Sequence, residues 1–199
     1  VQFPEGVSIL RAAELAGITI PSLCAHKDLS PFGGCRLCVV EVQGIEGTPL
    51  ACSTTATDGM VVRTNTPALR AHQRQVLQLL LSEHPSSCLV CGSECGPYMG
   101  TFKKSGVATG CRSCPADERC ELQAVTRFLG VSDIDRPILY RGLAPEREDP
   151  FFDRDYNICI LCGRCVRMCQ EMRGTGVLAF NWRGSKATIG PAFGRSHVE

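Results

Sequence analysis

The chain has 199 residues, of which 44% are hydrophobic, and its formal net charge at pH 7 is +1. This composition allows a packed core, whereas the near-neutral charge argues against a nucleic-acid partner or a polybasic membrane anchor. No apolar run approaches the roughly 20 residues of a membrane-spanning helix, so we expect a soluble or peripheral protein without a membrane span.

The fourteen cysteines stand in groups rather than being scattered. Grouped cysteines fit metal clusters better than disulfides, and they indicate a reducing compartment, so a cytoplasmic location is expected. The chain begins at Val1 rather than at a methionine and ends at Glu199 in a polar stretch, which predicts a fragment.

The first 66 residues predict short strands around one helix. Ser8 is typical of a helix N-cap, and Gly17 is typical of the position that closes a helix. The apolar face between them comprises Ile9, Ala12, Ala13 and Ala16. Alternation over residues 38–42 and 60–63 predicts two strands. Residues 1–66 are therefore interpreted as a β-grasp domain.

The first cysteine group is spaced C-x10-C-x2-C-x13-C and comprises Cys24, Cys35, Cys38 and Cys52. Four thiolates in such a loop predict a [2Fe–2S] cluster, and we expect the close pair Cys35 and Cys38 to hold one iron and the two outer cysteines the other. Gly33 and Gly34 allow the loop to wrap closely around a cluster. Disulfides and a zinc knuckle are alternatives, but zinc sites usually show two tight cysteine pairs.

This spacing, with a first gap longer than the plant-type C-x4-C-x2-C, resembles the N-terminal ferredoxin module of the complex I large iron–sulfur subunit family. That family includes the diaphorase small subunits of NAD-linked hydrogenases, iron-only hydrogenases and some formate dehydrogenases. The later motifs follow in the same order, so the resemblance covers nearly the whole chain. It also implies a β-grasp fold for the N-terminal domain.

Two longer helices are predicted in the middle of the chain. Thr66 and Pro67 are typical of a helix start, and Pro85 ends the pattern. Its expected packing face comprises Leu69, Val76, Leu79 and Leu80. A second helix is predicted over residues 117–129. Its expected apolar face comprises Leu122, Val125, Phe128 and Leu129.

The second group of candidate ligands comprises His84, Cys88, Cys91, Cys95, Cys111, Cys114 and Cys120. The family resemblance implies a [4Fe–4S] cluster on H-x3-C-x2-C-x5-C followed by Glu-Leu-Gln. Here residues 92–110 split the pattern into two halves. Residues 67–131 are interpreted as a small helical His/Cys cluster domain with an inserted cysteine-rich loop.

Two ligand sets for this cluster are open, and both use Cys120. The favoured set comprises His84, Cys111, Cys114 and Cys120, and an added metal site then comprises Cys88, Cys91 and Cys95. The other set takes its two middle ligands from Cys88 and Cys91. A third arrangement joins the tight pairs that start at Cys88 and Cys111 into a zinc ribbon. Imidazole in place of thiolate removes negative charge, which should raise the cluster potential.

The third cysteine group is spaced C-x2-C-x2-C-x3-C and comprises Cys159, Cys162, Cys165 and Cys169. This run is typical of bacterial [4Fe–4S] ferredoxins, in which the fourth cysteine ligates a different cluster. We expect the first three cysteines to hold one [4Fe–4S] cluster. We expect Cys169 to start a helix and to serve a neighbouring cluster whose other ligands lie past Glu199.

The proline that normally follows such a run is replaced by Gln170. In the family that the chain resembles, this feature belongs to the first of two ferredoxin runs. Residues 156–199 are therefore interpreted as a truncated ferredoxin-like half-domain. Residues 132–155 are charged and contain prolines, which predicts a surface linker.

The predicted fold class is α+β, and the predicted function is electron transfer. Several clusters along one chain suit a relay of single electrons, and no nucleophile triad, dinucleotide-binding loop or P-loop is present, so no catalytic residue is predicted. The resemblance implies a multi-subunit complex with a flavin-containing NAD(P)H dehydrogenase subunit as one partner. The second partner that the resemblance implies is a hydrogenase, formate dehydrogenase or quinone-reducing subunit.

Two further functions are alternatives. The chain is alternatively the N-terminal part of a catalytic subunit, namely an iron-only hydrogenase or a molybdopterin formate dehydrogenase. A structural zinc protein is the third alternative, which iron and sulfide analysis separates from the first two.

Overall fold

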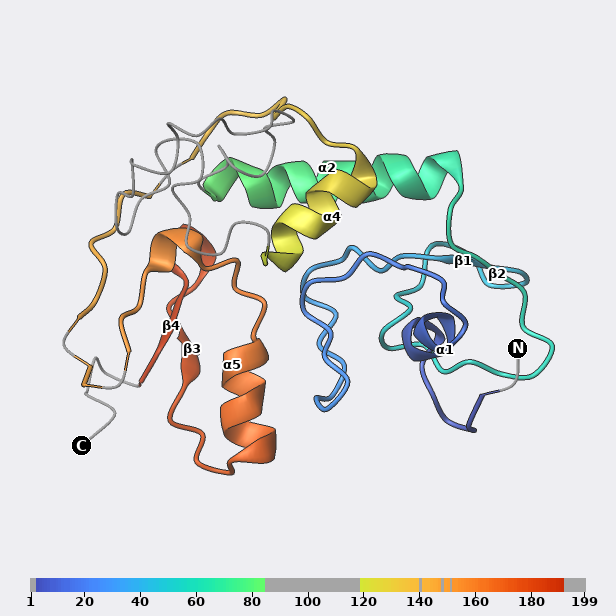
Figure 1. Cartoon of the computed structure of the whole chain (residues 1–199), viewed down its shortest axis with the longest axis horizontal. Coiled ribbons are helices and arrows are strands. Elements are labelled where there is room, and N and C mark those ends of the chain that lie inside the picture. The colour runs from blue at the N-terminus through green and yellow to red at the C-terminus, as the bar shows by residue number, and fades with distance from the viewer. Residues whose placement is uncertain (1–2, 85–118, 140, 148, 151, 192–199) are drawn as a thin grey trace. The chain divides into compact units, whose positions relative to one another are not determined.

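The computed structural model describes residues 3–84, 119–139, 141–147, 149–150 and 152–191. The chain divides into two units, Val1–Leu77 and Gln78–Glu199, which are described separately below (Figure 1). The described residues form helices and two small antiparallel sheets, in agreement with a mixed α and β fold class. Within them, no helix has the length and apolar character needed to cross a membrane.

Helix α1 (Ile9–Leu15) has the two end signals that the sequence predicts. The Ser8 hydroxyl accepts a hydrogen bond from the Arg11 amide at 3.2 Å, which satisfies one of the free N–H groups of the first turn. Gly17 follows the helix with a φ of 72°, a left-handed conformation that a glycine adopts without strain. Both predicted end signals are confirmed.

The N-terminal end of α1 is bound to the chain around Cys52. The amide of Ile9 donates to the carbonyl of Thr54, and the amide of Leu10 donates to the carbonyl of Ala51, both at 2.8 Å. Free amides at the start of a helix need such partners when they are buried. The helix therefore fixes the turn that carries the last cysteine of the first group.

Strand β1 (Glu41–Val42) pairs antiparallel with β2 (Val62–Arg63), so both strands are shorter than predicted. The residues just before β1 pair with a different segment. The Ala51 amide donates to the Cys38 carbonyl at 2.8 Å, and Val39 forms an isolated bridge with Leu50. The change of partner ends the regular ladder and brings the backbone of Cys38 beside that of Ala51.

The hydrophobic core of the N-terminal unit includes two members of the first cysteine group. Its buried residues are Ile9, Leu10, Ala13, Ile20, Cys38, Val40, Val42, Ala51 and Cys52. Cysteine packs as a small apolar side chain in such a core. The positions of Cys38 and Cys52 are thus fixed by the same packing that holds α1 against the sheet.

Helix α2 (Pro67–Glu83) begins where the sequence predicts. The Thr66 hydroxyl accepts from the Leu69 amide at 3.3 Å and donates to Glu41 Oε1 at 2.7 Å. Thr66 therefore caps α2 and links it to β1. The proline predicted to stop the helix, Pro85, lies outside the described residues, and the helix ends two residues before it.

The predicted packing face of α2 is wrong in part. Its fully buried residues are Leu69, Gln73, Leu77 and Leu81. Leu79, which was expected on that face, is 56% exposed. The buried row follows a spacing of four and includes a polar side chain at Gln73, so a search for apolar side chains alone selects the wrong row.

Helix α4 (Glu121–Leu129) is the second predicted helix, and it begins at 121 rather than at 117. Cys120 occupies the N-cap position, and Gly130 ends the helix with a φ of 63°. Three of the four predicted face residues, Leu122, Val125 and Leu129, are buried. Phe128 is 40% exposed, so its predicted packing is wrong.

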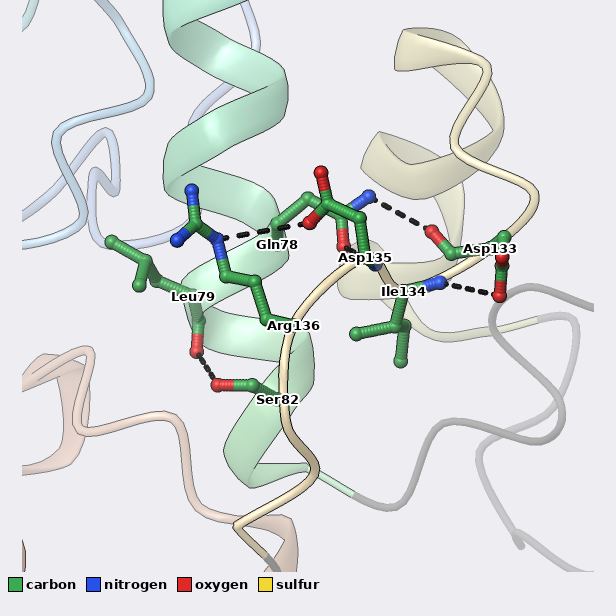
Figure 2. A network of polar contacts seen from close by, with 7 residues as sticks. All are labelled: Gln78, Leu79, Ser82, Asp133, Ile134, Asp135 and Arg136. Carbon is green, nitrogen blue, oxygen red and sulfur yellow. Dashed lines mark hydrogen bonds and ion pairs between the residues drawn. The ribbon is translucent and has the colours of Figure 1, made fainter.

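The segment predicted as a linker is hydrogen bonded to the end of α2 over part of its length (Figure 2). The Gln78 side chain donates to the carbonyl of Asp133 at 2.8 Å and accepts from the amide of Asp135 at 3.2 Å. The Leu139 amide donates to the Ser82 carbonyl at 2.7 Å. Residues 133–139 are therefore attached at both ends, although they form no helix or strand.

The C-terminal unit continues with a helical stretch and a hairpin. Helix α5 (Arg164–Arg167) runs directly into a π-helical turn, η3 (Met168–Met172). Strand β3 (Ala179–Asn181) pairs antiparallel with β4 (Thr188–Gly190) (Figure 1). The sequence analysis did not predict this hairpin, because each strand has only three residues and its connection includes the short helical turn η4 (Gly184–Lys186).

Candidate metal centres

The four thiols of the first group are buried together in the N-terminal unit. The exposed fractions of Cys24, Cys35, Cys38 and Cys52 are 0%, 8%, 1% and 4%. The thiols hydrogen bond in two pairs, one formed by Cys24 and Cys35 and the other by Cys38 and Cys52. These hydrogen-bonded pairs differ from the expected grouping of Cys35 with Cys38 at one iron, which stays a prediction.

Backbone contacts explain this pairing. The Leu23 amide donates to the Cys35 sulfur at 3.4 Å, and the Cys35 amide donates to the Cys24 sulfur at 3.5 Å. These reciprocal bonds hold the first pair together across a long loop. The second pair follows from the backbone bond between Cys38 and Ala51, the residue next to Cys52. Closeness in sequence does not decide which thiols meet.

Each thiol pair favours one thiolate. The hydrogen bond from the Cys35 thiol lowers the pKa of Cys24 to about 6. The hydrogen bond from the Cys38 thiol likewise lowers the pKa of Cys52 to about 6. The pKa values of Cys35 and Cys38 are raised, because each donates the shared proton and is buried. Two thiolates are thus available at neutral pH in a buried site.

The loop between the first two cysteines requires its glycines. Gly33 has a φ of 67°, and a Cβ atom there would lie 2.9 Å from Cδ1 of Leu50. A Cβ atom on Gly34 would overlap the ring of Phe32. The backbone of Gly34 hydrogen bonds to the Cys24 sulfur, and that of Gly33 to the Cys52 sulfur. The glycines therefore place backbone N–H groups against the cysteine sulfur atoms.

This donor set fits a two-iron cluster. Such a cluster takes two thiolates at each iron, which matches two buried pairs, and backbone N–H donors stabilise its sulfur atoms. In the part of the chain that the structure describes, no three histidine, cysteine or carboxylate side chains form a group that could hold a metal ion.

The second ligand group is described only at its two ends. His84 follows the last residue of α2, where its amide donates to the Leu81 carbonyl at 3.3 Å. Cys120 caps α4, and its carbonyl accepts from the Ala124 amide at 3.0 Å. The five remaining members, Cys88, Cys91, Cys95, Cys111 and Cys114, lie outside the described residues. The structure therefore leaves the predicted ligand sets untested.

The third group borders a cavity of about 500 Å³ in the C-terminal unit. Three of its cysteines, Cys159, Cys165 and Cys169, line this cavity together with Tyr156 and Leu178. Burial raises the pKa values of Cys159 and Cys165, and the nearby Cys162 adds repulsion between like charges. A bound cation would remove this penalty, as expected for thiolates that ligate a metal.

Cys169 differs from the other three cysteines in its contacts. Its sulfur lies 3.0 Å from the Thr175 hydroxyl and accepts from the Leu178 amide at 3.5 Å. The hydrogen bond from the Leu178 amide has the largest effect on the pKa of Cys169, and together with that of Thr175 it lowers this pKa. Cys169 lies inside the π-helical turn after α5, so the prediction that it starts a helix is wrong. The helix begins instead at Arg164, because Gly163 turns the chain with a φ of 68°.

Sequence reasoning missed one contact between the second and third groups. Arg164 Nη1 lies 2.8 Å from Oε1 and 2.7 Å from Oε2 of Glu121. Glu121 was noted only as part of the Glu-Leu-Gln motif. No local pattern connects two residues that are 43 positions apart, so the contact becomes visible only in the fold.

Residues 1–67 match the model of the family described as "2Fe-2S iron-sulfur cluster binding domain". This part of the chain is similar to that family. The match covers all four buried thiols of the first group.

Relatives extend the similarity to the rest of the chain. An NADH-quinone oxidoreductase subunit of Rhizobium meliloti (strain 1021) is 36% identical over 191 residues, which are 95% of this chain and 20% of the relative. "NADP-reducing hydrogenase subunit HndD" of Solidesulfovibrio fructosivorans is 37% identical over 199 residues, covering 96% of this chain and 29% of the relative. The chain thus spans less than a third of these relatives, and the predicted resemblance is confirmed.

A solved structure shows the same similarity. The crystal structure of NAD+-reducing [NiFe]-hydrogenase in the H2-reduced state includes a chain that is 28% identical to this one, with a TM-score of 0.75. The match covers 96% of this chain and 71% of that chain. The fold is therefore shared with a chain of an NAD+-reducing hydrogenase.

Proposed function

We propose that this chain is an iron–sulfur electron-transfer module that passes electrons between an NAD(P)H-linked flavin dehydrogenase subunit and a second redox site. The observation that carries the proposal is the set of four buried thiols inside residues 1–67, the segment that matches a 2Fe-2S domain. The names of the relatives, among them an "NADPH-Fe(3+) oxidoreductase subunit alpha" of Geobacter sulfurreducens, support electron transfer linked to nicotinamide nucleotides.

In this proposal the buried pairs divide the ligands between two irons. Cys24 and Cys35 hold one iron, and Cys38 and Cys52 hold the other. When bound, a [2Fe–2S] cluster accepts and releases one electron at a time. The backbone N–H groups of the Gly33-Gly34 loop counter the added negative charge, and burial keeps water away from the sulfur atoms.

We assign the finer domain organisation in the same terms. Residues 1–66 form a β-grasp domain, residues 67–131 a His/Cys cluster domain, and residues 156–199 a ferredoxin-like half-domain after a connecting segment. Two [4Fe–4S] clusters belong to the last two domains. In the favoured arrangement, the ligands of the first comprise His84, Cys111, Cys114 and Cys120, and those of the second include Cys159, Cys162 and Cys165.

The cysteines in the inserted loop need a separate role in this assignment. Free thiols at the spacing of Cys88, Cys91 and Cys95 are prone to oxidation, so we assign them to an additional cluster or a zinc ion. Thiolate ligands of this kind persist in a reducing compartment, which supports a cytoplasmic location for the complex.

The second candidate function is the N-terminal part of a catalytic subunit. The observation that favours it is the greater length of the relatives, of which this chain covers 20% to 29% in the two cases above. Turnover of hydrogen or formate by the full-length gene product would support this candidate. An electron-transfer subunit alone would show neither activity.

The decisive experiment is metal analysis of anaerobically purified protein. The proposal expects iron and acid-labile sulfide in nearly equal amounts, a rhombic paramagnetic signal from the [2Fe–2S] centre after reduction, and further signals from [4Fe–4S] centres. Zinc without labile sulfide would contradict it. Reduction of these centres by NAD(P)H only when a flavin-containing dehydrogenase is added would support the proposed partner.

A further inference from the structure

One ion pair in the C-terminal unit connects the second ligand group to the third. Nη1 of Arg164 lies 2.8 Å from Oε1 and 2.7 Å from Oε2 of Glu121, so a single nitrogen contacts both carboxylate oxygens. Glu121 is the first residue of α4 and Arg164 is the first residue of α5. The contact therefore joins the N-terminal ends of two helices that are far apart in sequence.

Both residues are neighbours of candidate ligands. Glu121 directly follows Cys120, which is used in both cluster ligand sets considered above for the second group. Arg164 lies between Cys162 and Cys165. Adjacent Cα atoms are about 3.8 Å apart, so each side chain of the pair is attached to the backbone beside a candidate ligand. The contact thus connects the backbone next to one ligand of each proposed cluster.

Local structure and stability do not account for the pair. The dipole of α4 favours Glu121 in its first turn, whereas the four-residue helix α5 gives Arg164 no comparable local preference. The side chains of Arg164 and Glu121 are 26% and 61% exposed, and ion pairs with this degree of exposure add little stability. What distinguishes the pair is its position between two ligand groups.

We propose that Glu121 and Arg164 are positioning residues that set the separation of the two clusters and thereby the rate of electron transfer between them. This inference rests on the proposed function. In the step concerned, one electron leaves the reduced cluster, which is oxidised, and enters its neighbour, which is reduced, and no proton or bond is exchanged. The guanidinium of Arg164 also places a positive charge at the Cys162–Cys165 turn, and the carboxylate of Glu121 places a negative charge beside Cys120.

The test uses the whole chain with its clusters and four variants. Glu121→Gln and Arg164→Gln each remove the ion pair, whereas the double variant E121R/R164E restores it with the charges exchanged. Arg11→Gln is the matched control, because Arg11 and Glu14 form an exposed ion pair at 2.9 Å in the other unit, remote in sequence from the second and third ligand groups. Each protein is reduced by dithionite, and iron, sulfide and cluster signals are measured first.

Two measurements then follow. Paramagnetic coupling between the reduced clusters reports their separation, and rapid photoreduction reports the rate of electron transfer between them. We expect each single variant to weaken the coupling and to slow the transfer, because a larger separation between the clusters reduces both. The double variant should recover both values, and Arg11→Gln should change neither.

The outcomes separate this inference from the proposed function. A wild-type chain without iron–sulfur signals would overturn the proposed function. Wild-type signals together with unchanged coupling and rate in both single variants would overturn only the inference, as would a double variant that fails to recover. If a Gln variant takes up less iron, the double variant E121R/R164E carries the test, and a full cluster content with weakened coupling in it would contradict the inference.

Discussion

The buried thiols of the first group illustrate how single residues create a metal site. Cys24 and Cys52 are favoured as thiolates because each accepts a hydrogen bond from a partner thiol, and their pKa values are each about 6. Burial alone would have the opposite effect, since it disfavours the charged form. The paired arrangement therefore prepares two of the four thiols for iron before any metal binds.

The first prediction concerns this site. Replacing Cys35 with serine should abolish the rhombic [2Fe–2S] signal, because the substitution removes one ligand and also the hydrogen bond that favours the Cys24 thiolate. Electron paramagnetic resonance of the reduced protein measures the loss. Cys165→Ser is the control, and it should leave this signal unchanged. A signal of full intensity in the Cys35 variant would refute the ligand assignment.

The second prediction concerns His84. Replacing His84 with cysteine should retain the [4Fe–4S] cluster and lower its potential, because thiolate adds negative charge that imidazole lacks. Replacing Cys88 with serine should leave the same cluster intact. Redox titration followed by paramagnetic resonance measures both. If the Cys88 variant loses this cluster, the ligands are instead Cys88 and Cys91.

The third prediction concerns Cys169. Its sulfur is hydrogen bonded to Thr175 and Leu178 rather than to the other cysteines of the third group. Replacing Cys169 with serine should leave the signal of the cluster on Cys159, Cys162 and Cys165. Replacing Cys165 with serine should remove that signal. Equal loss in the two variants would show that Cys169 closes the same cluster.

At the scale of elements, local signals located the helices, but long-range contacts decided their faces. Ser8 and Thr66 cap helices as predicted, since a cap depends on neighbours within three residues. The buried face of α2 was predicted wrongly because it includes Gln73, a polar residue that is fully buried. The pairing of the first four thiols was missed for a similar reason, since backbone bonds far apart in sequence determine it.

The fourth prediction concerns the segment attached to α2 in Figure 2. Replacing Gln78 with alanine removes its bonds to Asp133 and Asp135, each of which contributes about 1 kcal/mol. Amide hydrogen exchange over residues 133–139 should accelerate roughly thirtyfold, because about 2 kcal/mol is lost in total and each ~1.4 kcal/mol corresponds to about a factor of ten. Gln75→Ala, on the exposed surface of the same helix, should have no effect on that segment. Unchanged exchange in the Gln78 variant would show that the backbone bond of Leu139 alone holds the segment.

At the scale of the whole molecule, the sequence predicted the order of the metal centres better than their connections. Cysteine spacing identified the first and third groups, because ligands of one cluster often lie close together along a loop. The contact between Glu121 and Arg164 was not predictable, since it depends on how α4 and the Cys162–Cys165 turn pack within the C-terminal unit. Spacing identifies candidate ligands, whereas the fold determines which centres share a contact.

The last prediction follows from the division into the units Val1–Leu77 and Gln78–Glu199. Cys38 is 1% exposed and belongs to the core that includes Ile9, Val40 and Cys52. Replacing Cys38 with serine places a hydroxyl in that core and removes an iron ligand, so residues 9–62 should lose protection against hydrogen exchange. Each unit has its own internal contacts, so residues 121–190 should retain their protection and their [4Fe–4S] signals. Hydrogen exchange measured by mass spectrometry on both units checks this prediction. The Cys165→Ser variant provides the reverse comparison, because its substitution lies in the C-terminal unit. A simultaneous loss of protection throughout the chain would mean that the two units unfold as one.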